Sequence, residues 1–408
     1  MQFDINFVRQ QFPALAQSSE SKIAFLENAG GSCLCTQTTE ILNSYYNHHR
    51  VQPYHATPIS QDAGNAMNAG YTALATYLNV DENDLYFGPS TSQNTYVLAN
   101  ALWGYLQEGD EIIVTNQDHE ANSGSWRRLK NRGVIVREWQ VDSETGSLSL
   151  EKLHNLLSEK TKLVAFPHCS NILGEINPVV KICSMAHQVG AKAIVDVVSF
   201  AGHGLPDVKD LGADIYLFSL YKVYGPHLGV MVISQQMAGL LESQGHYFNS
   251  AEREKRLMPA GPDHAQIAAI KGVSNYFDAV FEHHYGVDGA VNDKAAIIRS
   301  LFHEAERVPL DRLLAYLNQH PKVTIMGPKT SHNRAPTISF LPQGQSPHAL
   351  VRSVGDLGAM GAAGHFYSPR LLTALGINPD SGVARYSLVH YNSLADVDLL
   401  IDALEQCL

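Results

Sequence analysis

One lysine follows an otherwise apolar run, and its position suggests covalent chemistry. Residues 214–221 before Lys222 are mostly apolar, and a glycine-containing turn at 223–229 follows it. Where burial makes a charge costly, an ammonium group loses its proton readily, and the neutral amine can form a Schiff base with an aldehyde. A solvated lysine in a turn is the simpler interpretation of Lys222 alone, so the case depends on the residues around it.

Asp196 has a similar position, because it directly follows the apolar residues 193–195. A carboxylate at the end of a buried strand needs a partner, and a protonated pyridine nitrogen is a suitable one. A helix cap or a salt bridge explains Asp196 better when it is considered alone.

Hydroxyl groups gather at residues 88–94, between a strand-like run and a helical pattern. Thr91 and Ser92 would lie at the helix N-terminus, where free backbone amides attract an anion such as a phosphate. Ser219, three residues before Lys222, is placed to supply another hydroxyl. Ordinary N-capping is an equally good interpretation of the segment by itself.

Two further polar residues follow strand-like runs. His119 is a candidate for stacking on an aromatic cofactor or for acid–base chemistry, and Asn171 for donating to a phenolate oxygen. A surface histidine, one of 19 in the chain, and an asparagine in a turn are the simpler alternatives. Together, an amine nucleophile, a pyridinium carboxylate, a phosphate cup and a stacking imidazole favour pyridoxal 5'-phosphate as the cofactor.

The candidate residues follow short runs rich in β-branched residues, and these runs alternate with helical patterns along the chain. Such alternation is typical of an α/β fold with a largely parallel, helix-covered sheet. Ligands bind beyond the carboxyl ends of its strands, so the side chains directly after each run are the candidates for a site. The predicted strands are 23–27, 84–87, 111–115, 134–139, 162–166, 191–195, 214–218 and 229–233.

The pattern changes near residue 263 and predicts a second, smaller α+β domain. Its expected helices are 265–284, 290–317, 347–357 and 394–404, and its expected strands are 323–326, 337–341 and 383–390. We therefore expect an N-terminal segment at 1–20 that packs with the small domain, a large cofactor-binding domain at 21–262 and a small domain at 263–408.

The composition indicates a folded protein with a small-molecule partner. The 408 residues are 45% hydrophobic and 17% charged, which is enough to bury a large core. A formal charge of −11 argues against nucleic acid or an anionic membrane as a partner. The first residues contain no basic segment followed by an apolar run, no stretch is apolar enough to span a bilayer, and five cysteines fit reduced thiols, so we expect a cytoplasmic location. Cys33 and Cys35 lack a common zinc spacing, and we expect no metal.

The chain resembles the class V aminotransferase family of fold type I pyridoxal phosphate enzymes, which includes the cysteine desulfurases. The resemblance covers nearly the whole length and implies a mostly parallel seven-stranded sheet and a homodimer. It rests on ordered motifs: Phe-Leu-Glu-Asn-Ala-Gly at 25–30, Asp-His-x-Ala-Asn at 118–122, Ser-Asn-x-x-Gly at 170–174, Pro178, Asp196 with His203, Ser-x-x-Lys-x-x-Gly-Pro at 219–226 and Arg-x-Ser-Leu-x-x-Tyr-Asn at 385–392.

The resemblance also implies roles for single residues. Lys222 would form the internal aldimine with the cofactor, Asp196 would pair with the pyridine nitrogen, and His119 would stack on the ring, which makes these three the catalytic candidates. Arg385 would bind the substrate α-carboxylate, a task suited to a guanidinium group. The remaining candidates are substrate contacts from Asn28 and His55, and cofactor contacts from Thr91, Ser92, Asn171, Ser199, Ser219 and Tyr221.

Four departures separate the chain from many members of the family. Ser199 and Tyr221 stand where many relatives have glutamine and histidine, and Gly261-Pro262 lacks the hydroxyl of a Gly-Thr pair. Residues 364–368 correspond to the loop that carries the persulfide-forming cysteine in desulfurases, but they include Tyr367 and no cysteine. A tyrosine cannot accept sulfur as a thiolate does, so a loop persulfide is not expected.

The leading hypothesis is a pyridoxal phosphate enzyme that acts on an α-amino acid substrate. Desulfurase-like or C–S lyase chemistry, a β-elimination without a loop cysteine, is the favoured reaction. Transamination and epimerisation are alternatives that fit the broader family. A catalytically silent binding or scaffold protein is a hypothesis of another class; the departures motivate it, and the retained Lys222, Asp196, His119 and Arg385 oppose it.

Overall fold

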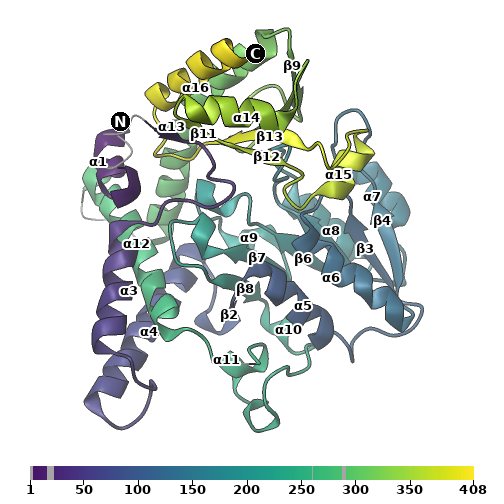
Figure 1. Cartoon of the computed structure of the whole chain (residues 1–408). Helices are drawn as coiled ribbons and strands as arrows, with labels where there is room; N and C mark the ends of the chain where they lie inside the picture. The colour runs from purple at the N-terminus through teal and green to yellow at the C-terminus, as the bar shows by residue number, and fades with distance from the viewer. Residues whose placement is uncertain (1–2, 16–22, 260, 287–290) are drawn as a thin grey trace.

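The main sheet of the protein has seven strands in the order β2-β8-β7-β6-β5-β3-β4. The computed structural model describes residues 3–15, 23–259, 261–286 and 291–408 (Figure 1). All neighbouring strands are parallel except that β8 runs antiparallel to β2 and β7. The predicted mostly parallel seven-stranded sheet is therefore confirmed. Its strands are β2 (Leu85–Gly88), β3 (Glu111–Thr115), β4 (Ile135–Trp139), β5 (Thr161–Pro167), β6 (Lys192–Asp196), β7 (Ile215–Ser219) and β8 (Gly229–Ile233).

An apolar core lies on each face of this sheet, and successive side chains of a strand enter the two cores alternately. In β7, Tyr216 and Phe218 enter one apolar core, while Ile215 and Leu217 enter the other. Burial of each such side chain contributes roughly 1.5–3 kcal/mol. The first core includes side chains of α3 (Thr36–His48), α4 (Pro58–Leu78), α8 (Val179–Gln188), α9 (Val208–Leu211) and α12 (His264–Tyr285), and the second includes side chains of α5 (Thr91–Ala101), α6 (Gly124–Arg127) and α10 (Gln235–Ala238).

A second, antiparallel sheet of four strands forms the upper part of the molecule in Figure 1. It is composed of β9 (Val323–Met326), β10 (Thr337–Pro342), β12 (Ala362–Gly364) and β13 (Val383–Ser387). A third apolar core joins it to α13 (Val291–Gln319), α14 (Pro347–Asp356) and α16 (Leu394–Cys407). This arrangement confirms the predicted smaller α+β unit. Further α-helices are α1 (Ile5–Gln10), α7 (Leu150–Leu156), α11 (Arg253–Arg256) and α15 (Pro369–Ala374). None of the described helices has the length and apolar character of a membrane span.

The strand-like run at 23–27 does not join the main sheet. It contributes β1 (Ala24–Phe25), which pairs in parallel with β11 (Ala359–Met360), and Glu27 bridges to Ser387 of β13. The expectation that this run belongs to the large sheet was wrong, because its hydrogen-bonding partners lie more than three hundred residues later in the chain. The residues that follow β1 thus lie between the seven-stranded sheet and the four-stranded sheet.

The predicted limits of the N-terminal segment, the large domain and the small domain separate helices that contact one another in the structure. α12, which begins directly after the predicted boundary at 262, packs against α3 and α4 beside the large sheet (Figure 1). In α1, Arg9 forms an ion pair of 2.8 Å with Asp396, and the Asp4 amide donates to His284 at the end of α12. The start of the chain therefore contacts both regions, and residues 16–20 of the predicted N-terminal segment lie outside the described residues.

Candidate active site

A cavity of about 260 Å³ lies at the carboxyl ends of the sheet strands. Most of the predicted site residues line it, because they follow several strands whose carboxyl ends lie at one edge of the sheet. β2 leads to Thr91 and Ser92, β3 to His119, β5 to Asn171, β6 to Asp196 and Ser199, and β7 to Ser219, Tyr221 and Lys222. Arg385 of β13 reaches the same cavity from the smaller sheet.

Lys222 extends into this cavity from the short turn after β7. Its Nζ donates a hydrogen bond to the Ala29 carbonyl, and it lies 5.0 Å from the centre of the Tyr221 ring. Burial, and then the positive charge of Arg385, lower the pKa of Lys222 from 10.5 to about 7. A large fraction of the lysine is therefore a neutral amine near neutral pH, the form needed for nucleophilic and base chemistry.

Asp196 ends β6 with a buried carboxylate. Its Oδ1 accepts the Val198 amide at 2.9 Å. Burial raises the pKa of Asp196 to about 6, while that amide and the charge of Lys222 act in the opposite direction. A cation beside the carboxylate would favour its ionised form further, so Asp196 suits a cationic ring nitrogen as a partner.

An anion-binding arrangement occurs where α5 begins. The Thr91 and Ser219 hydroxyls lie 2.7 Å apart, and the Thr91 amide donates to the Ser219 hydroxyl at 3.3 Å. Both residues and Ser92 line the cavity at the positive end of the helix dipole. Hydroxyls and backbone amides at a helix N-terminus form a suitable site for a phosphate.

His119 lines the cavity as a neutral imidazole. Its Nδ1 accepts the Ala121 amide at 3.0 Å, which assigns the ring proton to Nε2. Burial, reinforced by the charges of Lys222 and Arg385, lowers its pKa to about 4. A neutral, fixed aromatic ring of this kind is suited to stacking on another ring rather than to ion pairing.

Arg385 is fully buried, and its guanidinium group is held by two neighbours. Nη1 donates to the Asn171 carbonyl at 3.1 Å, and the guanidinium carbon lies 3.7 Å from the centre of the Phe366 ring. Burial lowers the pKa of Arg385 to about 10, which still leaves it protonated at neutral pH. A fixed, desolvated guanidinium group is well suited to bind a carboxylate.

Residues 364–368 form a loop that closes one side of the cavity. The Asn171 side chain donates to the Phe366 carbonyl and accepts from the Ser368 hydroxyl, each at 2.8 Å. Phe366 and Tyr367 both have positive φ values, of 46° and 59°. Bulky residues rarely adopt this left-handed conformation, so the hydrogen bonds must hold the loop in place.

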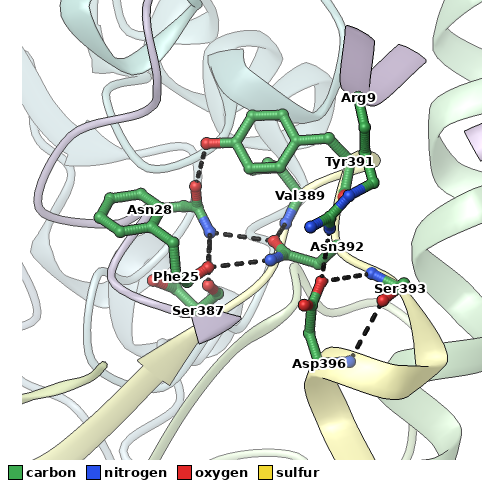
Figure 2. A network of polar contacts seen from close by, with 9 residues as sticks. All are labelled: Arg9, Phe25, Asn28, Ser387, Val389, Tyr391, Asn392, Ser393 and Asp396. Atoms are coloured by element: carbon green, nitrogen blue, oxygen red, sulfur yellow. Dashed lines mark hydrogen bonds and ion pairs between the residues drawn. The ribbon is translucent and has the colours of Figure 1, made fainter. Parts of the chain in front are cut away.

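Asn28 is a predicted substrate contact that does not line the main cavity. Its Nδ2 donates to the Ser387 carbonyl at 2.7 Å and to Asn392 Oδ1 at 3.0 Å, and its oxygen accepts from the Tyr391 hydroxyl (Figure 2). The side chain thus joins the β1 segment to the end of β13. It lines a smaller, neighbouring cavity together with Ser199 and Lys222.

His55 is the other predicted contact that lies outside the cavity. It is exposed on the segment that precedes α4. Its backbone amide donates to the Ser60 hydroxyl at 2.8 Å. A contribution from His55 to a substrate site stays a prediction that requires a second subunit.

Sequence reasoning missed two groups that line the cavity. Glu27 and the Ala29 carbonyl enter from the segment after β1, and Phe366 packs on Arg385. The motif at 25–30 includes Glu27 and Ala29, but the strand-like run at 23–27 was assigned to the large sheet, so their place in the cavity was not predicted. Cys169 is buried and also lines the cavity, and burial raises its pKa to about 12.

Comparison with known proteins identifies the family of the chain. The family model described as aminotransferase class-V matches residues 24–400. The chain belongs to the class V aminotransferases.

Known proteins from several organisms are similar to the chain over its full length. An aminotransferase-like protein of Gibberella zeae is 36% identical over 426 residues, which cover 100% of this chain and 99% of the relative. A cysteine desulfurase of Synechococcus elongatus is 29% identical over 99% of this chain and 64% of its own length. The apo structure of a cysteine desulfurase from Thermococcus onnurineus has a TM-score of 0.86 at 23% identity, with 100% of this chain and 98% of that chain covered. This last likeness shows the shared fold.

Pyridoxal 5'-phosphate is the cofactor of class V aminotransferases, and the cavity of this member fits it. The buried Asp196 carboxylate suits a pyridinium nitrogen, and the hydroxyls of Thr91 and Ser219 at the start of α5 suit a phosphate. Lys222 provides an amine whose pKa is lowered to about 7, so that a substantial fraction is neutral at neutral pH and can react with the aldehyde. The chain is accordingly a pyridoxal phosphate-dependent enzyme, as the sequence predicted.

Proposed function

We propose that this enzyme catalyses β-elimination from an α-amino acid whose side chain resembles that of cysteine, a C–S lyase reaction without a cysteine persulfide. The observation that carries the proposal is the composition of the cavity. It combines Lys222, with its lowered pKa, and the buried Arg385 with a loop that presents Tyr367 in place of a thiol. These groups are sufficient to bind an amino acid and remove its α-proton.

Each residue has a distinct task in this proposal. Arg385 binds the substrate carboxylate, and its contacts with Phe366 and the Asn171 carbonyl fix the direction of the guanidinium group. Lys222, as a neutral amine, takes the proton from Cα. Bound pyridoxal phosphate supplies the electron sink that makes this proton acidic, and the Asp196 carboxylate keeps the ring nitrogen protonated.

The state of the cysteines argues against sulfur transfer to a protein thiol. Burial raises the pKa of all five thiols, Cys33, Cys35, Cys169, Cys183 and Cys407. Cys169 alone among them lines the cavity, and its pKa of about 12 keeps it protonated at neutral pH. A thiol is a poor nucleophile compared with a thiolate, so these residues are unsuited to accept sulfur.

The proposal is tested by product analysis on the purified enzyme with bound pyridoxal phosphate. Incubation with cysteine, cystine and S-alkyl cysteines, without any keto acid, should release pyruvate and ammonia in equal amounts. Lys222→Ala should abolish this release. If the wild-type enzyme forms no pyruvate from any of these substrates, the elimination proposal is wrong.

Transamination is the second candidate, and its support is the 36% identity to an aminotransferase-like protein. It predicts consumption of an added keto acid and formation of a new amino acid, while epimerisation predicts loss of optical activity without a keto product. The same incubations, repeated with pyruvate or 2-oxoglutarate and chiral chromatography, separate these reactions. A silent scaffold protein would leave the visible spectrum of the bound cofactor unchanged by every amino acid.

We also infer a cytoplasmic homodimer in which His55 and the Gly261 segment of one subunit approach the site of the other. The support is the family resemblance together with the exposed position of His55 on the segment before α4. Sedimentation equilibrium at micromolar concentration tests the dimer directly. A single species of 44.7 kDa would contradict it.

A further inference from the structure

The loop at 364–368 places a phenol where the sulfur-accepting thiol of a desulfurase is expected. Tyr367 lines the active-site cavity, and its ring centre lies 5.1 Å from that of His119. The two rings are tilted by 38°. Tyr367 therefore lies at the cavity wall formed by His119, beside the space that a substrate side chain would enter.

The position of Tyr367 is determined by contacts on both sides of its backbone. The Tyr367 carbonyl accepts the amide of Glu120 at 2.7 Å, which ties the loop to the residue after His119. The Tyr367 amide donates to His365 Nδ1 at 3.0 Å, and Arg370 pairs with Glu120 at 3.3 Å. These contacts compensate for the positive φ of Tyr367, which costs of order 1 kcal/mol or more for a non-glycine residue. Strain of this kind is typical of functional positions.

The side chain combines access to the cavity with access to water. Tyr367 is 66% exposed, although its residue lines the cavity. A phenol at such a boundary can give a proton to a group inside the cavity and regain one from solvent. Tyrosine is one of the side chains that act as general acids in enzymes.

Three other polar groups of the cavity, those of His119, Cys169 and Asp196, are less suited to this task. His119 has a pKa of about 4 and is neutral at pH 7, so it rarely carries the additional proton. Cys169 is buried at the cavity wall, and Asp196 is required as a carboxylate. Lys222 is the base that takes the α-proton, so it is the main competitor as a proton donor to the leaving group.

We propose that Tyr367 is the general acid that protonates the departing sulfur during β-elimination. This inference rests on the proposed function. Lys222 takes the proton from Cα, and the electron pair of that C–H bond forms the double bond between Cα and Cβ. The Cβ–S bond breaks, its electron pair stays on sulfur, and sulfur takes the Tyr367 proton and leaves as a neutral thiol. The phenolate then takes a proton from water, so atoms and charge balance.

Leaving groups that differ in their need for a proton provide the test. An S-alkyl cysteine must release a thiolate or a thiol, whereas β-chloroalanine releases chloride, which needs no proton. Tyr367→Phe should lower kcat/KM for S-ethylcysteine by about 10²-fold, the usual contribution of general acid catalysis, and should leave β-chloroalanine little changed. Tyr247→Phe, a change at a residue that is 90% exposed and outside the cavity, is the matched control and should affect neither substrate.

A series of S-aryl cysteines provides a second measurement on the same variant. As the released thiol becomes more acidic, the difference between wild type and Tyr367→Phe should shrink. The visible absorption of the bound cofactor reports whether the variant is folded and loaded.

The outcomes separate the two proposals. If the wild-type enzyme eliminates from neither substrate, the proposed function fails and this assignment fails with it. If the wild type is active and Tyr367→Phe slows S-ethylcysteine and β-chloroalanine equally, Tyr367 is only a wall of the cavity and the assignment is overturned. The same conclusion follows if the variant slows neither, because the Lys222 ammonium group would then be the proton donor.

Discussion

Removal of the buried amine should change the stability of the apoenzyme in a manner that depends on pH. The pKa of Lys222 falls from 10.5 in an unfolded chain to about 7 in the folded protein, mainly because of burial. Above pH 10.5 the amine is neutral in both states and has no ionisation cost. As the pH falls from 10.5 to 7, the unfolded lysine binds a proton that the folded lysine does not, so the folded state is increasingly disfavoured.

The magnitude follows from about 1.4 kcal/mol for each pH unit in that window. Relative to Lys222→Met, the wild-type apoenzyme should lose about 1 kcal/mol at pH 10, about 3 kcal/mol at pH 8 and about 5 kcal/mol below pH 7. Methionine has a similar volume and no charge, and the lost hydrogen bond to the Ala29 carbonyl contributes a difference that does not depend on pH. The free energies of unfolding in urea, measured for both proteins at these pH values, test the reasoning.

Lys209→Met provides the matched control, because Lys209 is exposed. Its effect on the free energy of unfolding should be small and nearly constant across the same pH range. A difference between wild type and Lys222→Met that does not grow as the pH falls from 10 to 8 would refute the argument. It would mean that Lys222 stays protonated in the folded apoenzyme and does not supply the neutral amine that we propose as the base.

Two other substitutions separate binding from stability. Arg385→Leu should raise the KM for the amino acid about 10- to 100-fold, because a charged hydrogen-bonded pair with the substrate carboxylate is lost. The variant should still bind its cofactor. An unchanged KM in steady-state assays would contradict a carboxylate-binding role. Asn28→Ala should lower the free energy of unfolding by about 2–3 kcal/mol, because the buried partners of Asn28 lose their hydrogen bonds. The KM for the amino acid should stay nearly unchanged. A large rise in KM with little loss of stability would instead support Asn28 as a substrate contact.

The strand-end residues could be predicted because one simple rule connects them. Thr91, His119 and Asp196 each follow an apolar run, and parallel strands that alternate with helices end at one edge. The rule needs only the order of runs along the chain. It therefore predicted that these side chains lie close together without any information on how they pack.

Other features depend on contacts that no local pattern records. Asn28 lies next to the predicted site residues, but its partners Ser387 and Asn392 are 359 and 364 residues away. They use the amide in a buried network (Figure 2). The packing of Phe366 on Arg385 depends on a positive φ that the sequence of the loop does not encode, since phenylalanine rarely adopts it.

The pairing of β1 with β11 mechanically couples the smaller sheet to the reacting amine. The chain passes from this pairing through Glu27 to the Ala29 carbonyl, which accepts the Lys222 hydrogen bond. A rotation of the smaller sheet relative to the large one would therefore shift the carbonyl that holds Lys222, and it would shift Arg385 of β13 as well. Any such rotation would thus change the proposed carboxylate site at Arg385 and the hydrogen bond of the Lys222 amine in one movement.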